Sequence, residues 1–431
     1  MHTRTLIPLA LALALSHAFP ACAIPLDAPR LPETRAAALT PADQAYQRAL
    51  QSLVGGDLKA AEQAFQQVLK LEPQSAKAML GLAEVAYLNK RRGEAGQWIQ
   101  RAVQTAPDSS EAQASLGRYF ALEGKNKEAE AALRKSAELD AAAVRPRVDL
   151  GDLLSAQGRL PDAVKFYQQA LAIEPRHAGA HYALGIALAR LGENAKAQAE
   201  MEQAARLEPK NPLPQVALAR LYAGLNDPGK AILAVDRALA LQPGLVDALL
   251  LRGDLLDAKG QTAQAIISYQ AAAQSAPRLA LPQLKIAMTA HRTGQPDLAQ
   301  ASYKKAIELD PKQAIAYNNL AALALERKQD LAQAETWARK AVELAPNVAD
   351  FHDTLGWILR ARGNAKGALG ALQKAAQLAP KNPEIQYHLG ALYAETGDKP
   401  KAREALKQAL AASGSFPSAA EAKKLLASLE R

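Results

Sequence analysis

The positions of the prolines constrain this chain more than any other feature. Seven of them fall on a 34-residue grid, at Pro73, Pro107, Pro175, Pro209, Pro243, Pro277 and Pro311. Ala141 takes the one vacant grid point, and Pro346 and Pro380 follow after steps of 35 and 34 residues. A length of 431 residues would also allow two or three unrelated domains, but a fixed period of this size is typical of a structural repeat. With proline placed at position 32, eleven repeats run over residues 42–416.

Small residues recur at fixed positions within each repeat. Position 8 is Gly or Ala, position 20 is always Ala, and positions 7 and 24 hold larger residues such as Leu184, Phe65 and Tyr167. Small residues let two helices approach closely, and the larger ones fill the space beside them. A glycine follows most of the first helices, where a left-handed residue is required, and the proline ends the second helix. The pattern predicts an all-α chain of helix pairs, each with a helix A and a helix B.

This pattern resembles the tetratricopeptide repeat (TPR) family, which has a 34-residue period, small residues at positions 8, 20 and 27, and proline at 32. The resemblance covers residues 42–416. It implies a right-handed superhelix, or α-solenoid, of about eleven helix pairs, whose concave surface is lined mainly by A helices and binds a peptide. Residues 417–431 carry Ala422, Leu425 and Leu429 on one side of an amphipathic pattern, and we expect a C-terminal capping helix that covers the open end.

Two repeats depart from the pattern. Repeat 9 carries one extra residue, which we place in the turn of LERKQDLAQAE (325–335), because an insertion costs least in a turn. Repeat 3 lacks its proline, and Pro146 instead begins the next A helix, so this junction is expected to differ slightly from the others.

The N-terminus has the pattern of a secretory signal over residues 1–23. Arg4 precedes an apolar run from Leu6 to Leu15, which is too short to span a membrane. Residues 24–41 are rich in proline and predict an extended tether. Thr40 and Pro41 then provide the N-cap and first position of the first helix.

The single cysteine, Cys22, leaves two alternatives for localisation. Cleavage after Ala23, favoured by small Ala21 and Ala23, removes the cysteine and gives a periplasmic or secreted protein. Lipidation of Cys22 would instead give an outer-membrane lipoprotein and the only contact with a membrane that we expect. Phe19 and Pro20 fit a lipoprotein signal poorly, so the first alternative is favoured.

No catalytic motif, cofactor site or metal site is predicted. The chain lacks a phosphate-binding G-x-x-x-x-G-K loop, an H-E-x-x-H motif and a G-x-S-x-G motif. His177 and His181 have a metal-binding i, i+4 spacing, but they lie across a repeat boundary, so packing is the favoured role. The net charge is +9, yet Lys and Arg alternate with Glu and Asp, as in KNKEAEAALRKSAE (125–138). Nucleic-acid binding would require a continuous basic stripe with stacking aromatics, and we expect none.

In the TPR family the concave positions of helix A are chiefly 2, 5, 9, 12 and 13. Applied to this chain, they predict a groove that is basic in repeats 3–6 and acidic in repeat 7, with an aromatic residue later. The predicted groove residues are Arg118, Arg145, Asp152, Tyr182, Arg190, Arg220, Asp247, Asp254, Asp257, His291, Arg292, Asn318 and Trp357. The alternative is that these are ordinary solvated faces of amphipathic helices. The four arginines favour a protein partner with an acidic segment.

The closing repeats and FPSAAEAKKLLASL (416–429) are similar to exported TPR proteins of bacterial exopolysaccharide and PEP-CTERM (exosortase) systems. The function predicted from the sequence is therefore a non-enzymatic protein–protein interaction scaffold of the cell envelope, which binds a partner segment in its groove. The alternative is a carbohydrate-handling or enzymatic subunit that acts through the same groove.

Overall fold

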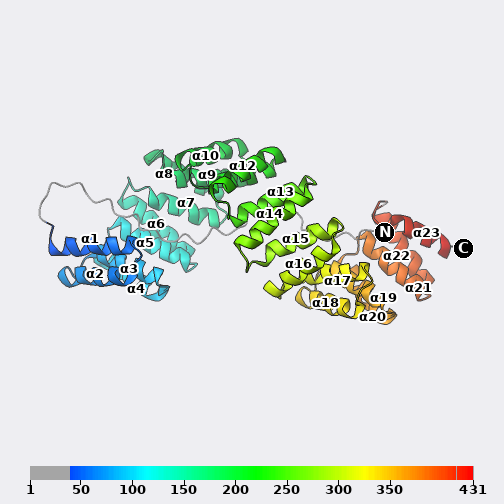
Figure 1. Ribbon diagram of the computed structural model, residues 1–431. Helices are drawn as coiled ribbons and strands as arrows, with labels where there is room; N and C mark the ends of the chain where they lie inside the picture. Colours follow the sequence, from blue (N-terminus) through cyan, green and yellow to red (C-terminus); the bar gives the residue numbers. More distant parts are fainter. Residues whose placement is uncertain (1–38, 414, 431) are drawn as a thin grey trace. The chain divides into compact units, whose positions relative to one another are not determined.

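A computed structural model describes residues 39–413 and 415–430, and within them every regular element is an α-helix (Figure 1). Twenty-two helices form eleven A–B pairs, and one further helix follows, so the all-α solenoid expected from the repeats is confirmed. The signal over residues 1–23, Cys22 and the tether as far as residue 38 lie outside the described residues.

The helices repeat at nearly constant length. The A helices are α1 Pro41–Val54, α3 Ala76–Leu88, α5 Ser110–Leu122, α7 Arg145–Ala156, α9 Ala178–Arg190, α11 Leu213–Gly224, α13 Val246–Ala258, α15 Ala280–Arg292, α17 Ala314–Glu326, α19 Ala349–Ala361 and α21 Pro383–Glu395. The B helices are α2 Leu58–Leu71, α4 Arg92–Thr105, α6 Asn126–Leu139, α8 Leu160–Ile173, α10 Asn194–Leu207, α12 Pro228–Leu241, α14 Thr262–Ser275, α16 Pro296–Leu309, α18 Leu331–Leu344, α20 Ala365–Leu378 and α22 Lys399–Ala412. The closing helix is α23, Ala419–Leu429.

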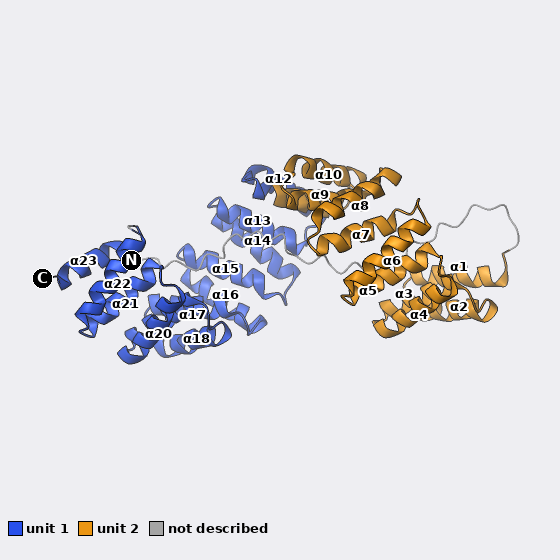
Figure 2. Ribbon diagram, turned by 180° about the vertical axis from the view of Figure 1, so that it is seen from behind, with its two compact units in different colours: residues 1–13, 222–431 blue, residues 14–221 orange. Residues whose placement is uncertain are grey.

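The described chain divides into two compact units (Figure 2). The N-terminal unit contains residues 39–221 and the C-terminal unit contains residues 222–430, with the division inside α11. In each pair that lies within one unit, helix A packs against helix B, and most B helices pack against the next A helix. Several consecutive A helices also touch, such as α5 with α7 and α17 with α19. Each pair is thus covered by its neighbours, as expected where one repeat cannot bury its own apolar face.

The close approach of helices A and B depends on the small residues. The alanines at position 20 are all at most 2% exposed. At position 8, a Cβ atom built on Gly151 would lie 2.4 Å from Cε1 of the buried Tyr167, and one built on Gly253 would lie 2.2 Å from Cε1 of Tyr269. Real Cβ atoms do not come this close, so glycine is required there for the tyrosine to pack.

The turn between helices A and B contains a left-handed residue at position 15 in all eleven repeats. Glycine occupies eight of these positions, while Lys90, Asn226 and Lys328 adopt φ of 61°, 58° and 53°. The extra residue of repeat 9 lies in this turn, as predicted, where Asp330 takes a second positive φ and caps α18 by accepting a hydrogen bond from the Gln333 amide.

Both ends of the array and the repeat 3–4 junction follow local sequence signals. Thr40 is the N-cap of α1 and Pro41 its first residue, as predicted, and Thr40 also forms a capping box with Asp43. At the repeat 3–4 junction, Pro146 lies in the first turn of α7, which has 12 residues. The last helix, α23, packs against α21 and α22, and Ser418 donates hydrogen bonds to Glu384 of α21. The predicted capping helix is therefore present.

Candidate binding surface

The polar residues predicted for the groove are connected from one A helix to the next. Position 12 of one A helix pairs with position 13 of the following one in four places. Arg190 Nη1 donates to the Ser155 carbonyl oxygen at 3.1 Å, and His291 Nε2 lies 3.0 Å from Glu326 Oε2. Arg292 pairs with Asp257, and Arg360 with Glu395. These 35-residue links hold neighbouring repeats in register within each unit.

A second set of links joins position 9 to position 6 of the next A helix. Arg118 Nη1 lies 3.0 Å from Asp149 Oδ2, and Lys285 Nζ lies 2.8 Å from Asp254 Oδ1. In the third case the link is aromatic, since Trp357 stacks on His388 with 4.2 Å between ring centroids. The same two positions are therefore bridged by two ion pairs of opposite direction and by one aromatic stack.

The four predicted arginines all lie in the N-terminal unit, and they differ in exposure. The side chains of Arg118 and Arg145 are 13% and 24% exposed, and both pair with the carboxylate of Asp149. Arg190 is exposed, whereas Arg220 is half-buried. Tyr182 is also half-buried, and burial raises its pKa, with a smaller opposing effect of the Arg220 charge. The alternative of ordinary solvated helix faces therefore fits Arg190 but not Arg118.

Two of the predicted carboxylates have a structural partner that the sequence analysis missed. Asp152 Oδ1 accepts a hydrogen bond of 2.7 Å from the hydroxyl of Tyr167, and Asp254 Oδ1 accepts one of 2.7 Å from Tyr269. Burial raises the pKa of Asp152 to about 6, although the bond from Tyr167 opposes the shift. The signal was present in the sequence, because each Asp lies directly after the glycine against which its tyrosine packs.

The remaining predicted residues differ in their surroundings. Asp247 is exposed in the first turn of α13, whereas Asn318 is buried and donates to Asn319 Oδ1 at 3.2 Å. The guanidinium of Arg360 lies 4.2 Å from the ring centroid of Trp357. From Asp247 onward these residues belong to the C-terminal unit, so the arginines of repeats 3–6 and the carboxylates of repeat 7 lie in different units.

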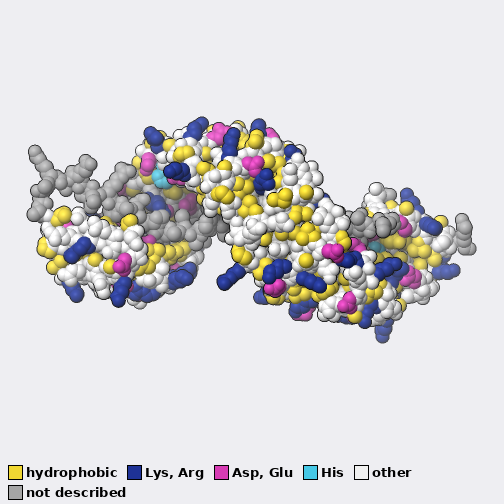
Figure 3. Space-filling model, in the orientation of Figure 1, with side chains coloured by type: hydrophobic (Ala, Val, Ile, Leu, Met, Phe, Trp, Pro, Cys, Tyr) yellow, Lys and Arg dark blue, Asp and Glu magenta, His cyan; other side chains and the backbone are white. Residues whose placement is uncertain are grey.

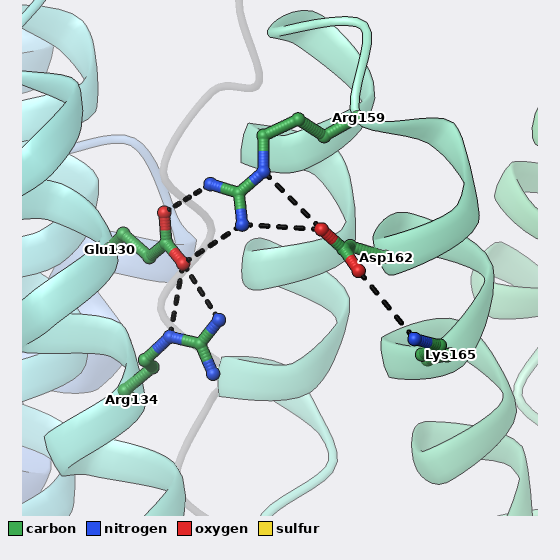
Figure 4. A network of polar contacts seen from close by, with 5 residues as sticks. All are labelled: Glu130, Arg134, Arg159, Asp162 and Lys165. Carbon is green, nitrogen blue, oxygen red and sulfur yellow. Dashed lines mark hydrogen bonds and ion pairs between the residues drawn. The ribbon is translucent and has the colours of Figure 1, made fainter.

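B helices and their preceding turns carry a separate set of ion pairs. In Figure 4, Glu130 of α6 receives hydrogen bonds from Arg134 on its own helix and from Arg159 at the start of α8. Arg159 also pairs with Asp162, whose other oxygen lies 3.7 Å from Lys165. Burial alone would raise the pKa of Glu130, but the two arginines outweigh it and lower the pKa. The network joins repeats 3 and 4 across the junction without the proline.

The two histidines with metal-like spacing have structural roles. His177 caps α9, since its Nδ1 accepts a hydrogen bond from the Ala180 amide at 3.0 Å. His181 contacts Glu200 through Nδ1 and the Pro175 carbonyl oxygen through Nε2. Over the described ranges, no group of three or more His, Cys, Asp or Glu side chains is placed to hold a metal ion.

On the face of the molecule seen in Figure 3, Lys and Arg side chains are interspersed with Asp and Glu side chains and form no continuous patch of one charge. None of the helices in residues 39–430 is long and apolar enough to cross a membrane.

A pocket that the sequence analysis did not identify lies between α3, α4 and α5. Its lining residues are Leu80, Ala83, Glu84, Tyr87, Ala95, Ile99, Ser115 and Tyr119. Glu84 is only 7% exposed, and burial raises its pKa to about 7, with the Arg118 charge opposing the shift. A charged residue at position 9 looks like part of a solvated helix face in the sequence, so the burial of Glu84 was not predictable from its type.

Models of known protein families match most of the repeats. Models described as "Tetratricopeptide repeat" match residues 55–119 and 359–429, residues 216–280 and 284–349, and residues 178–211. One described as "TPR repeat" matches residues 151–192. Together the matches leave only residues 120–150, 212–215, 281–283 and 350–358 unmatched between residue 55 and residue 429. The chain belongs to the tetratricopeptide repeat family.

Several solved structures are similar to this TPR protein. A chain of the APC/C hetero-tetramer Cut9–Hcn1 is 15% identical over 91% of this chain and 97% of that chain, with a TM-score of 0.46. PilF of Pseudomonas aeruginosa is 21% identical over 49% of this chain and 97% of that chain, with a TM-score of 0.43. YrrB, a TPR protein described as having an unusual peptide-binding site, is 23% identical over 43% of this chain and 95% of that chain, with a TM-score of 0.35.

At these TM-scores the structural similarity does not support assigning the function of any of these proteins to this chain. A search of curated protein sequences gave no significant match. The links to exopolysaccharide and exosortase systems expected from the sequence therefore stay predictions.

Proposed function

We propose that this TPR protein is a non-enzymatic scaffold for protein–protein interaction, and that it binds a segment of a partner along the face formed by its A helices. Family membership supports this, since TPR arrays present extended surfaces built from successive repeats. The observation that carries the proposal is the register of polar side chains at positions 9, 12 and 13, which the 31- and 35-residue links align from helix to helix.

The arginines of the N-terminal unit favour an acidic segment in the partner. Arg118 and Arg145 both pair with the carboxylate of Asp149, so two guanidinium groups are held together at this part of the A-helix face. Arg190 is anchored by oxygens of Ser155, which are uncharged, and its guanidinium is exposed. Guanidinium groups bind carboxylates bidentately, so a partner segment with several Asp or Glu residues is the ligand that this surface suits.

A charge-reversal experiment tests the binding surface. Wild-type protein, the double variant Arg190→Glu with Arg220→Glu, and the control Arg206→Glu are used to capture proteins from envelope extracts. Arg206 is an exposed arginine on the B helix α10 of the same unit, so the control changes charge without changing the A-helix face. We expect the double variant to lose a partner that the control retains, and added salt to weaken binding in the wild type. Equal capture by all three proteins would contradict the proposed surface.

We further propose an exported location in the bacterial cell envelope and a role in exopolysaccharide or envelope assembly. The support is the signal pattern of residues 1–23 and the similarity of the closing repeats to exported TPR proteins. Mass spectrometry of the mature protein distinguishes the two forms. A chain that begins at Ile24 supports a soluble periplasmic or secreted protein, whereas a diacylated Cys22 would indicate an outer-membrane lipoprotein. A full-length chain that keeps residues 1–23 would contradict export.

A further inference from the structure

The pocket between α3, α4 and α5 combines apolar walls with one buried carboxylate. Leu80, Ala83 and Ile99 supply aliphatic surface, while Tyr87 and Tyr119 supply two half-buried aromatic rings. Its enclosed space is about 20 Å³, which is room for about one water-sized group, so the pocket can take the polar end of a side chain but not a cofactor.

Glu84 supplies the carboxylate of this pocket. Its side chain makes no hydrogen bond or ion pair with any described residue, although the residue is only 7% exposed. The nearest cation is Arg118, but its Nη1 donates to Asp149 and its Nη2 donates to Ser115. The buried Nε of Arg118 makes no hydrogen bond either, so the Arg118 charge lies near Glu84 without contacting it.

A buried carboxylate without a partner is costly, and most such groups in proteins are hydrogen-bonded or paired with a cation. The Glu84 oxygens are not among the fully buried side-chain atoms that lack a partner, so a cation from outside the chain can reach them. Gly96 contributes to the shape of the pocket. A Cβ atom on Gly96 would lie 2.4 Å from the Tyr119 hydroxyl oxygen and would displace the ring that forms one wall.

We infer that this pocket binds a primary ammonium group on an alkyl chain, namely a lysine side chain of the protein partner. The aliphatic residues contact the methylene stem, the tyrosine rings flank the cation, and Glu84 pairs with the ammonium group. An ammonium is compact and suits a single carboxylate in a narrow pocket, whereas a guanidinium is wide, planar and suited to bidentate partners. The inference deepens the proposed function and rests on it for the identity of the lysine as part of a protein.

A small-molecule titration tests the pocket without a known partner. The probe is Nα-acetyl-lysine N-methylamide, and the matched control probe is the norleucine analogue, which has the same stem without the ammonium group. The readout is the methyl NMR signal of Ile99 in full-length protein labelled at isoleucine, with Ile173 of α8 as a remote reference. We expect a saturable shift at Ile99 with the lysine probe, and binding of the norleucine probe to be weaker by roughly tenfold or more.

Two variants assign the effect to the carboxylate. Glu84→Gln keeps the size of the side chain and removes its charge, and it should weaken the lysine probe by roughly tenfold or more. Glu123→Gln changes an exposed Glu at the end of α5 in the same way and should leave binding unchanged. The inference is wrong if the two probes bind equally well, or if the lysine probe binds equally well to wild type and Glu84→Gln. It is also wrong if the Ile99 signal does not shift, because Glu84 is then solvated by water and binds no ammonium group.

Combining the probe titration with the capture experiment separates this inference from the proposed function. If the lysine probe binds through Glu84 but no protein is captured by the wild type, the scaffold proposal fails and the ammonium site stands. If a partner is captured and Glu84→Gln does not weaken it, the pocket serves a free amine and the assignment to a protein lysine is wrong. Loss of the captured partner with Glu84→Gln, and its retention with Glu123→Gln, supports the inference in full.

Discussion

Replacing Gly151 with alanine tests the packing rule that shapes every repeat. The new Cβ would lie 2.4 Å from Cε1, 2.6 Å from Cδ1 and 2.7 Å from Cζ of Tyr167, a side chain that is 0% exposed. Overpacking of this kind costs about 1–3 kcal/mol. Displacing the ring also strains the 2.7 Å bond to Asp152, and hydrogen bonds to charged groups contribute about 1.5–3 kcal/mol. Alanine regains about 0.5–1 kcal/mol of helix propensity, so we expect a net loss of about 2–4 kcal/mol.

Amide hydrogen exchange is the suitable assay, because a repeat array can open locally and has no single unfolding free energy. Gly151→Ala should speed exchange in α7 and α8. The control is Gly370→Ala in α20, where a Cβ would meet no atom within 4 Å, and there the same substitution should slow exchange. Adding Tyr167→Val copies repeat 6, where Ala219 and Val235 occupy these positions, and should restore part of the loss. A neutral Gly151→Ala, or purely additive effects, would refute the reasoning.

Three further predictions concern other parts of the array. Lys328→Gly relieves a left-handed φ of 53° at a residue with a side chain, and it should stabilise repeat 9 by up to about 1 kcal/mol, measured as slower amide exchange in α17 and α18, whereas faster exchange would contradict the turn assignment. Deletion from Pro417 onward removes α23 and the Ser418–Glu384 bonds, so amides of α21 and α22 should exchange faster, and unchanged exchange would count against a capping role. Glu84 holds its proton in the folded state up to a pKa of about 7 but releases it near 4.5 when unfolded, so its contribution to stability is complete below pH 4.5 and is lost as the pH rises through 7. Exchange of α3 and α5 should therefore be slower in Glu84→Gln than in wild type at pH 8 and similar in both at pH 5, after correction for intrinsic rates; a difference independent of pH would show that Glu84 is not the titrating group.

Most of the fold follows from the sequence because each repeat carries the residues that begin, end and space its two helices. The proline grid, the small residues at positions 8 and 20, and the turn glycines each predict a local geometry, and eleven copies agree on it. The insertion of repeat 9 and the closing helix were predictable for the same reason. The left-handed lysines at positions 90 and 328 were not, because the surrounding helices impose a conformation that lysine itself does not favour.

The candidate site was less predictable, because repeat position does not specify the partner of a side chain. Arg190 and Asp247 are exposed on A helices, but their place in a binding groove stays a prediction. It did not show that Asp152 and Asp254 accept hydrogen bonds from buried tyrosines, since that contact depends on the depth of the position 8 glycine beneath the ring. The burial of Glu84 was not predicted for a related reason, because residues that line its pocket, such as Tyr119 and Ile99, come from other helices.

The central claim is that partners bind along the A helices, and site-specific photocrosslinking in living cells tests it most directly. A photoreactive phenylalanine is placed on A helices at the exposed positions Arg190 and Asp247, and on B helices at Lys165 and Ile267, whose side chains are also exposed. Each unit thus carries one A-helix probe and one B-helix probe. We predict that a partner is crosslinked from an A-helix position and from neither B-helix position. Crosslinking of the same partner from the B helices alone would contradict the account.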